Sequence, residues 1–412
     1  MRKFAVSLMF MLGLAQATTL SGYAVLPADT FAAGPASGAF NGQGVRGVPR
    51  FQGQPVQGFS AVQFSGTCGT YLAMPDNGFG SKPNSADYLL RLYAVTPTFK
   101  TSPAAQGSVK VGDFIQLRDP DKKVPFLLVN ENTPERLLTG ADFDIESFVQ
   151  DNNGDIWIGD EFGPYLLHFD ATGKLLEAPF KVPTFAQGSD PSKDFVMSPQ
   201  NPAVLAASPA PGQPSLANLA SSGGFEGMAI NASRTRLYAL LEKTVVGDGE
   251  YDLRIYEFDL ASKTFTGKIH TYTKEEPGYA IGDMAVINDN EFLVIERDNK
   301  SGSDAAFKQI FRINLTDLDA EGKLNKQDIV DLMNIRDPQN LAGFGETFTF
   351  PFVTIEDVLV INPTTLLVMN DNNYDGKGGR GPDIKDPNEF LWLTLDQPLN
   401  VATGVGQPEN CK

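Results

Sequence analysis

The sequence predicts an all-β fold in which repeated hairpins are arranged as a β-propeller. The 412 residues include 40 glycines and 28 prolines, which favour turns and strands over long helices. No long segment has the 3.6-residue apolar period of an amphipathic helix. A pattern of strand, turn and strand recurs along the chain, and repeats of this kind are typical of propellers. We expect six blades, with five or seven as alternatives.

One hairpin shows the pattern most clearly. The turn Asp151–Gly154, rich in residues that tolerate a left-handed backbone, joins two short apolar runs. In an antiparallel hairpin, the residue before the first strand and the residue after the second lie side by side at the open end. Here these positions hold Glu146 and the pair Asp160 and Glu161. Acids that are distant in sequence are therefore expected to meet.

Three further hairpins repeat this arrangement, and a weaker copy carries Ser60 in place of the first acid. Their acid pairs are Glu226 with Glu242, Asp283 with Glu296, and Glu356 with Asp371. The two acids of a pair are separated by nearly the same number of residues in each hairpin. Each blade of a propeller brings its first strand to the central axis. We therefore expect these carboxylates to gather around one mouth of the channel. The alternative is that each acid is a solvated residue flanking its strand.

The first 17 residues have the layout of a signal peptide. Arg2 and Lys3 give a positive start, and the apolar stretch Phe4–Ala15 is too short to cross a bilayer comfortably. Ala15–Ala17 fits a small-residue cleavage motif. A membrane anchor is the alternative. The sequence therefore predicts export to the periplasm or the extracellular space, with cleavage after Ala17 and no transmembrane segment in the mature chain.

The rest of the chain is expected to form one domain. Residues 18–57, rich in Gly, Ala, Pro and Gln, are predicted to be a flexible leader that adds at most an edge strand. A single propeller then occupies residues 58–400, and residues 401–412 form a tail. Within the propeller, residues 178–223 are predicted to be an inserted loop. Loops of this length are uncommon unless they are functional or disordered.

The formal net charge of −17 restricts the partners. An acidic surface repels the phosphates of nucleic acids and anionic membranes, so neither is expected as a partner. A small anionic substrate remains compatible with the sequence if cations assist. We expect a monomer.

The chain has two cysteines, Cys68 and Cys411. This number excludes a disulfide-rich scaffold and a cysteine-based zinc site. Export permits a disulfide, and a bridge between these residues would fasten the two ends of a closed ring. Two unpaired thiols are the alternative.

A calcium-loop motif begins at Asp371. Asp371, Asn373 and Asp375 occupy alternate positions, and Gly376 follows, as in the opening of a calcium-binding loop. The closing glutamate and the flanking helices of an EF-hand are absent, so a polar turn is the alternative.

The ring of acids also points to a cation. Several carboxylates in one mouth repel one another unless they are protonated or bridged by metal. A set of oxygen donors alone favours Ca²⁺ over zinc or copper, which usually require imidazole or thiolate. The predicted metal ligands are Glu146, Asp160, Glu161, Glu226, Glu242, Asp283, Glu296, Glu356, Asp371, Asn373 and Asp375.

The composition limits the mechanism. Only two histidines are present, His168 and His270, both in expected outer strands, and no G-x-S-x-G motif occurs. If the protein is a hydrolase, water activated by metal is the more economical nucleophile. Lys243 and Arg297 each follow a ring acid and are candidates for binding phosphate, with ordinary ion pairing to that acid as the alternative. No catalytic residue is assigned.

Three motifs carry a resemblance to a known family. They are Phe225–Ala229, Asp160–Pro164 together with Phe169–Asp170, and Asn370–Asn373. Over roughly Gly58–Leu395, the chain resembles the exported family described as "esterase-like activity of phytase", also called phytase-like domain proteins.

The resemblance implies a β-propeller and, more distantly, a likeness to calcium-dependent propeller phytases. Those enzymes hold calcium in an acidic cleft and hydrolyse phosphate monoesters, so the resemblance implies the ring acids as metal ligands. A shared fold does not fix a reaction. Three functions therefore stay open: an exported calcium-dependent phosphoesterase, a non-catalytic calcium-stabilised binding scaffold, and a lactonase-like metal propeller.

Overall fold

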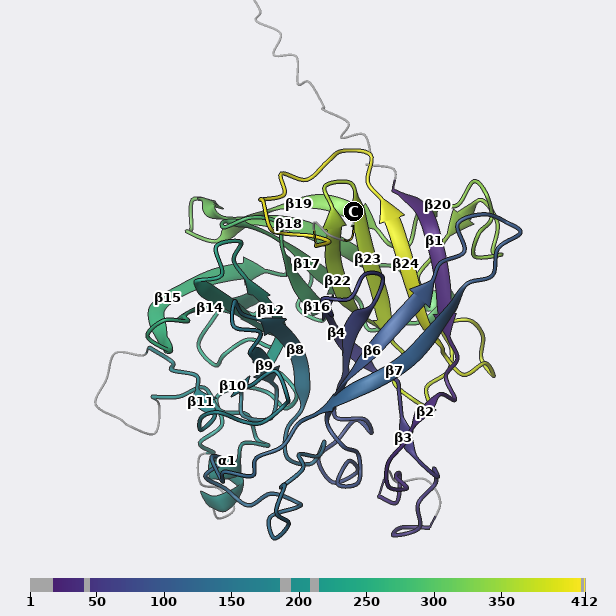
Figure 1. The fold of residues 1–412 in the computed structure, drawn as a ribbon. Helices are drawn as coiled ribbons and strands as arrows, with labels where there is room; N and C mark the ends of the chain where they lie inside the picture. Colours follow the sequence, from purple (N-terminus) through teal and green to yellow (C-terminus); the bar gives the residue numbers. More distant parts are fainter. Residues whose placement is uncertain (1–17, 41–44, 186–193, 208–214, 409–410, 412) are drawn as a thin grey trace, which may run out of the picture.

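The computed structural model describes residues 18–40, 45–185, 194–207, 215–408 and 411. The expected signal peptide and its cleavage after Ala17 lie outside these residues. Five sheets of four or more strands surround a central axis, so the fold is an all-β propeller of five blades (Figure 1). Five is one of the numbers that the sequence left open, whereas six was preferred. Among the described residues, the remaining short strands extend an existing sheet or form one small pair, so they add no sixth blade.

Each of the first four blades is a four-stranded antiparallel meander, with its first strand nearest the axis. Blade 1 contains β4 (Phe59–Phe64), β5 (Tyr71–Pro75), β6 (Arg91–Thr98) and β7 (Ser108–Gln116). Blade 2 contains β8 (Ile145–Gln150), β9 (Ile156–Asp160), β10 (Tyr165–Phe169) and β11 (Phe180–Lys181). Blade 3 contains β12 (Phe225–Ile230), β13 (Arg236–Leu241), β14 (Asp252–Asp259) and β15 (Thr264–Thr273). Blade 4 contains β16 (Ala280–Val286), β17 (Glu291–Arg297), β18 (Lys308–Leu318) and β19 (Leu324–Asp331).

Blade 5 joins the two ends of the chain. Its strands are β22 (Thr354–Asn362), β23 (Thr365–Asp371), β24 (Asn388–Thr394) and β1 (Thr19–Leu26), extended by β20 (Ile335–Arg336) and β21 (Thr347–Phe348). β1 pairs antiparallel with β24, beside which it lies in Figure 1. The elements outside the blades are β2 (Phe31–Ala32), β3 (Gln54–Pro55), the helix α1 (Pro202–Ala207) and the 3-10 turn η2 (Gly302–Asp304).

Part of the expected leader is therefore built into the propeller. The strand β1 alternates half-buried and buried residues, and its buried side chains, such as Ala24 and Leu26, pack between blades 5 and 1. This period-two pattern is that of a strand with one face on the core. A bridge between Cys68 and Cys411 adds a covalent closure, with 5.1 Å between the two Cα atoms. The predicted disulfide is confirmed.

The core is divided among the blade interfaces. Five separate clusters of buried apolar side chains occur, one between each pair of neighbouring blades. Burial of each large apolar side chain contributes about 1.5–3 kcal/mol. Since each sheet presents both faces to neighbours, its central strands read as nearly continuous apolar runs. The innermost strands of neighbouring blades contact one another around the axis. No helix in the described residues is long and apolar enough to cross a membrane.

The segment at residues 178–223, expected to be an inserted loop, contains regular secondary structure. It supplies β11, the fourth strand of blade 2, and α1. Ser198 Oγ donates to the Phe162 carbonyl at 2.5 Å, and Asn201 Nδ2 donates to the Gly163 carbonyl at 2.7 Å. These contacts fix the described part of the segment beside the turn that follows β9.

Candidate functional site: a buried ring of carboxylates

All five innermost strands have a β-bulge at the same place. The pairing register shifts after Phe59, Ile145, Phe225, Ile281 and Ile355. A bulge removes one residue from the ladder and redirects its side chain. The residues that follow the shift, here called the inner circle, are Ser60, Glu146, Glu226, Gly282 and Glu356. Three blades thus contribute a glutamate at an equivalent bulge.

The partner strands supply a second set at the same end. Each bulge is preceded by a pair that joins the first strand to the end of the second, for example Ile145 with Asp160 and Ile281 with Glu296. The residue after that partner lies one step beyond this pair, as Asp371 opposite Thr354 and Arg297 opposite Ala280. These residues, here called the outer circle, are Asp76, Glu161, Glu242, Arg297 and Asp371. Inner and outer circles together form the carboxylate ring.

The ring acids are close enough to suppress one another's ionisation. Burial raises the pKa of Glu146 well above its usual range, and the charges of Asp144, Glu226, Asp76 and Glu161 raise it further. Burial likewise raises the pKa of Glu226, with Glu356 as the strongest neighbouring charge. The structure therefore brings Glu146, Glu161, Glu226, Glu242, Glu356 and Asp371 of the predicted set together.

The hydrogen bonds across blades support this arrangement. Ser60 Oγ donates to Glu356 Oε2 at 3.3 Å, which joins blades 1 and 5. Burial and the charge of Asp371 raise the pKa of Glu356 to about 8 although Arg297 opposes the shift. Burial and the charge of Asp76 raise that of Asp371 to about 7. Empty of cations, the ring is thus partly protonated near neutral pH.

Blade 4 is the exception to the acid pattern. A Cβ atom on Gly282 would lie 2.0 Å from the Ile355 carbonyl oxygen, so no side chain fits at this bulge. Arg297, in the outer circle of the same blade, places Nη2 at 2.9 Å from Glu356 Oε1 and 4.0 Å from Glu226 Oε1. A guanidinium therefore lies among the carboxylates at the blade without its own inner acid.

Two ring acids and the neighbouring Asp144 have the composition of a cation site. Oxygens of Asp144, Glu146 and Glu161 lie within 4.8 Å of one another, and all three residues are buried. Asp144 Oδ1 and Glu161 Oε1 have no hydrogen-bond partner within the described protein. Buried carboxylate oxygens normally have partners. A donor set of oxygens alone suits a hard divalent cation such as calcium. These residues therefore fit the predicted ion.

Two further buried acids each follow an inner-circle residue in sequence. Asp283 accepts from the Met284 amide at 2.6 Å and from the Val358 amide at 2.9 Å, and burial raises its pKa to about 8. Asp357 is fully buried, and neither of its oxygens has a hydrogen-bond partner in the described residues. Asp283 was predicted for the ring; with Gly282 it lies between the paired residues Ile281 and Met284, and its carboxylate accepts two backbone amides instead. Its equivalent in blade 5 is Asp357.

Two other predicted ligands have structural partners instead. Asp160 accepts from the Asp144 amide at 2.9 Å and from the Gly163 amide at 2.7 Å. Glu296 accepts from the Tyr272 hydroxyl at 2.7 Å and the Glu275 amide at 2.6 Å, and it pairs with Lys326. Both residues precede an outer-circle residue by one position. Because side chains of a strand alternate between faces, a shift of one residue turns them away from the ring.

The residues of the calcium-loop motif do not all lie at the ring. Asp371 belongs to the ring, but Asp375 forms an ion pair with Arg50 at 2.7 Å. Asn373 donates its amide N–H to Asp371 Oδ1 at 2.6 Å, and its side chain contacts Thr354. The segment is thus a polar turn that presents Asp371, and the structure does not bring Asp375 to the ring.

Two lysines accompany Arg297. Lys243 contacts Glu242, and its side chain is 39% exposed. Burial opposes its charge, but the surrounding carboxylates raise its pKa. Lys82 donates to the Asp142 carbonyl at 3.2 Å and lies over the Phe162 ring, and burial lowers its pKa. Sequence analysis missed Lys82 because its signal is tertiary. It could have found Asp144 and Asp357, each within two residues of a predicted inner-circle acid.

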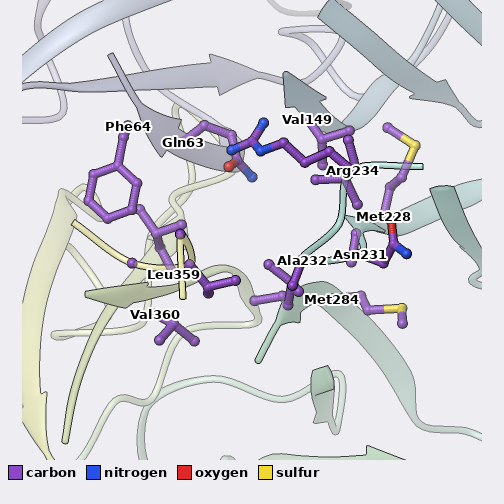
Figure 2. A pocket seen from close by; sticks show the side chains of 17 residues that line it. Gln63, Phe64, Val149, Met228, Asn231, Ala232, Arg234, Met284, Leu359 and Val360 are labelled. Carbon is purple, nitrogen blue, oxygen red and sulfur yellow. The ribbon is translucent and has the colours of Figure 1, made fainter. Parts of the chain in front are cut away.

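The opposite end of the channel has a different character. A cavity there is lined by Gln63, Val149, Met228, Met284 and Leu359 from the five innermost strands (Figure 2). The segment Gly404–Gly406 forms part of its wall, and no carboxylate is among its described lining residues. The two mouths of the channel are therefore chemically distinct.

Fold and site define the class: a five-bladed β-propeller with a buried carboxylate ring at one mouth of its channel. The chain belongs to the phytase-like family, described as "esterase-like activity of phytase", whose model matches residues 54–374. The chain is also 23% identical over 198 residues to an uncharacterized secreted protein of Arthroderma benhamiae. That match covers 40% of this chain and 36% of the relative.

Two solved structures illustrate the distant similarities of the fold. An exo-β-1,3-galactanase of Phanerochaete chrysosporium is 9% identical, with a TM-score of 0.40, over 96% of this chain and 69% of that one. The Dos1 propeller is 10% identical, with a TM-score of 0.27, over 79% of this chain and 73% of that one. Similarities at this level say nothing about activity.

Proposed function

We propose that this protein is an exported, calcium-binding propeller that hydrolyses a phosphoester at the carboxylate ring. The observation that carries the proposal is the group formed by Asp144, Glu146 and Glu161, with its unpartnered buried oxygens. Membership of the phytase-like family favours metal-dependent hydrolysis of phosphate esters. Export is supported by the layout of residues 1–17 and by the description of the relative as secreted.

Asp144, Glu146 and Glu161 are the residues that would hold the ion. When bound, calcium would neutralise phosphate charge and make a coordinated water more acidic. The neighbours Glu226, Glu242, Glu356, Asp76 and Asp371 are close enough for their charges to act on this part of the mouth, and a bound cation would favour their charged forms. Without cations, the same charges would repel any phosphate.

The basic residues would orient the substrate. Lys243 is the more accessible, with 39% of its side chain exposed, so it can meet an incoming anion without a large rearrangement. Arg297 is 4% exposed and held by Glu356. We assign Lys243 to substrate binding, and we assign Arg297 to positioning the ring carboxylates.

One observation favours the alternative of a non-catalytic, calcium-stabilised scaffold. Glu226 and Glu356 are only 4% and 5% exposed, so part of the ring is poorly accessible to a substrate. A cation held there would stabilise the ring without taking part in a reaction. Hydrolysis and cation binding must therefore be measured separately.

The test is a screen of the purified protein against phosphomonoesters, with calcium and with a chelator. We expect hydrolysis that requires calcium and that falls at least tenfold in Glu226→Gln, which keeps the shape of the side chain and removes a charge. The exposed Glu135, in the variant Glu135→Gln, is the matched control. Absence of hydrolysis in the wild type with calcium bound would leave the scaffold as the function.

A further inference from the structure

A second cluster of ligand-type side chains lies at the other end of blade 2. Asp151 and Asp155 belong to the turn between β8 and β9, and His168 lies on β10. One ligand atom from each residue lies within 4.8 Å of the others. The ring acids Glu146 and Glu161 lie at the opposite ends of the same strands, so this cluster is separate from the ring.

The imidazole of His168 is held in a fixed orientation. It is 3% exposed and stacks on Trp157, with 3.9 Å between ring centroids and 12° between planes. Its Nδ1 lies 2.8 Å from Glu177 Oε2, and Lys263 contacts the same carboxylate. With the Nδ1 proton donated to Glu177, Nε2 carries a lone pair.

This lone pair faces an acid. Nε2 lies 3.6 Å from Asp155 Oδ2 and has no hydrogen-bond partner among the described residues. The separation is long for a hydrogen bond. It suits two ligands of one small divalent cation, because a nitrogen and an oxygen each about 2.0–2.2 Å from a tetrahedral ion lie roughly 3.3–3.6 Å apart.

The turn positions the other carboxylate. Asp151 Oδ1 accepts from the amides of Asn153 and Asp155, and Oδ2 accepts from Trp157 Nε1 at 3.2 Å. The lone pairs left on its oxygens can still bind a cation. A zinc-bound histidine usually donates its other ring N–H to a carboxylate. For His168 that carboxylate is Glu177.

We propose that Asp151, Asp155 and His168 bind one divalent transition-metal cation of the zinc type. One imidazole and two carboxylates give three protein ligands, which leaves a fourth position for water or a ligand atom. The site does not depend on the proposed function of the ring, because it uses different residues and a different class of metal.

Zinc binding can be measured by equilibrium dialysis of the full-length protein with its ring saturated by calcium. We expect one more zinc in the wild type than in His168→Gln or in Asp155→Asn, whose side chain lies in a half-exposed turn and tolerates the change. His270→Gln, which removes the other histidine, should keep that zinc. Equal zinc content in the wild type, His168→Gln and Asp155→Asn would overturn the proposal and leave an ion-paired histidine.

A second readout reports the location. Trp157 stacks on His168, whereas the other tryptophan, Trp392, stacks on Phe99. Co²⁺ at the site should quench the Trp157 emission, measured in a Trp392→Phe background, and Zn²⁺ should reverse it. Glu177→Gln should weaken this quenching by about 10–100-fold in metal concentration. Quenching that is unchanged in His168→Gln would contradict the assignment.

Discussion

Arg297 on β17 donates from Nη2 to Glu356 Oε1 on β22 at 2.9 Å, so a buried ion pair joins blade 4 to blade 5. Arg297 lies beside the one innermost bulge that has no side chain, at Gly282. Its guanidinium offsets part of the charge of Glu356 and Glu226. Arg297 therefore compensates part of the ring charge between blades 4 and 5.

Replacing Arg297 by Gln should make folding more dependent on calcium. Loss of one partner leaves a buried charge uncompensated, which typically costs about 3–5 kcal/mol. We expect a loss of this order in a chelator, measured by urea unfolding, and a smaller loss in calcium. Lys385→Gln is a control because Lys385 pairs with Asp29 at a more exposed position. Equal losses in chelator and calcium would show that Arg297 does not compensate the ring.

Calcium should stabilise the protein more at pH 8 than at pH 5. Burial and neighbouring charges raise the pKa of Asp371 to about 7 and that of Glu356 to about 8, from roughly 4 in an unfolded chain. Because the pKa values of these acids are raised on folding, the acids contribute to the free energy of unfolding. This contribution is fully present below about pH 4 and is lost as the pH rises through 7 to 8. Calcium binds the deprotonated ring and should restore that stability.

The measurement is Tm in calcium minus Tm in chelator, from pH 5 to pH 8. We expect a difference that grows steadily across this range. A difference that is constant with pH would mean that calcium does not compete with protons on these acids.

Neighbouring acids should have different roles. Glu161→Gln should lower calcium affinity at least tenfold with a small change in calcium-free stability, since it removes one buried like charge. Asp160→Asn should destabilise the fold by about 1–3 kcal/mol, because Asp160 accepts two backbone amides, and should affect calcium less. Calcium titration by calorimetry and urea unfolding distinguish the two. The same effect of both variants on affinity would contradict the register described here.

Reducing the Cys68–Cys411 bridge should lower stability without changing the ring. The bridge closes a sequence separation of 343 residues, and the chain-entropy model assigns this on the order of 5 kcal/mol. The pairing of β1 with β24 already closes the propeller, so the measured loss should be smaller. Urea unfolding of the double variant Cys68→Ser, Cys411→Ser, with calcium titration as a control, tests this. Lost calcium binding in the folded variant would contradict it.

Most of the fold could be predicted from the sequence because local signals determine the hairpins. Turn residues such as those at Asp151–Gly154 define the hairpins, and the recurrence of the hairpins predicts the propeller. The number of blades depends on closure between β1 and β24, which no local pattern encodes. A preferred count of six was therefore one too many.

The sequence predicts that acids gather at the open ends of the hairpins, but not which residue of each strand end faces the ring. Glu226 and Glu356 could be predicted because each lies at a hairpin end, whereas Glu296, predicted as a ligand, has structural partners and the next residue, Arg297, lies among the ring acids. A bulge in the first strand shifts which residue of the second strand faces the channel, and a bulge cannot be recognised from apolar alternation alone.

A crystal structure of the protein grown in calcium would show whether calcium binds at the carboxylate ring. We expect an ion between Asp144, Glu146 and Glu161, with oxygen distances of about 2.3–2.6 Å. The same group holding only water, with its carboxylates joined by shared protons at saturating calcium and pH 8, would contradict it.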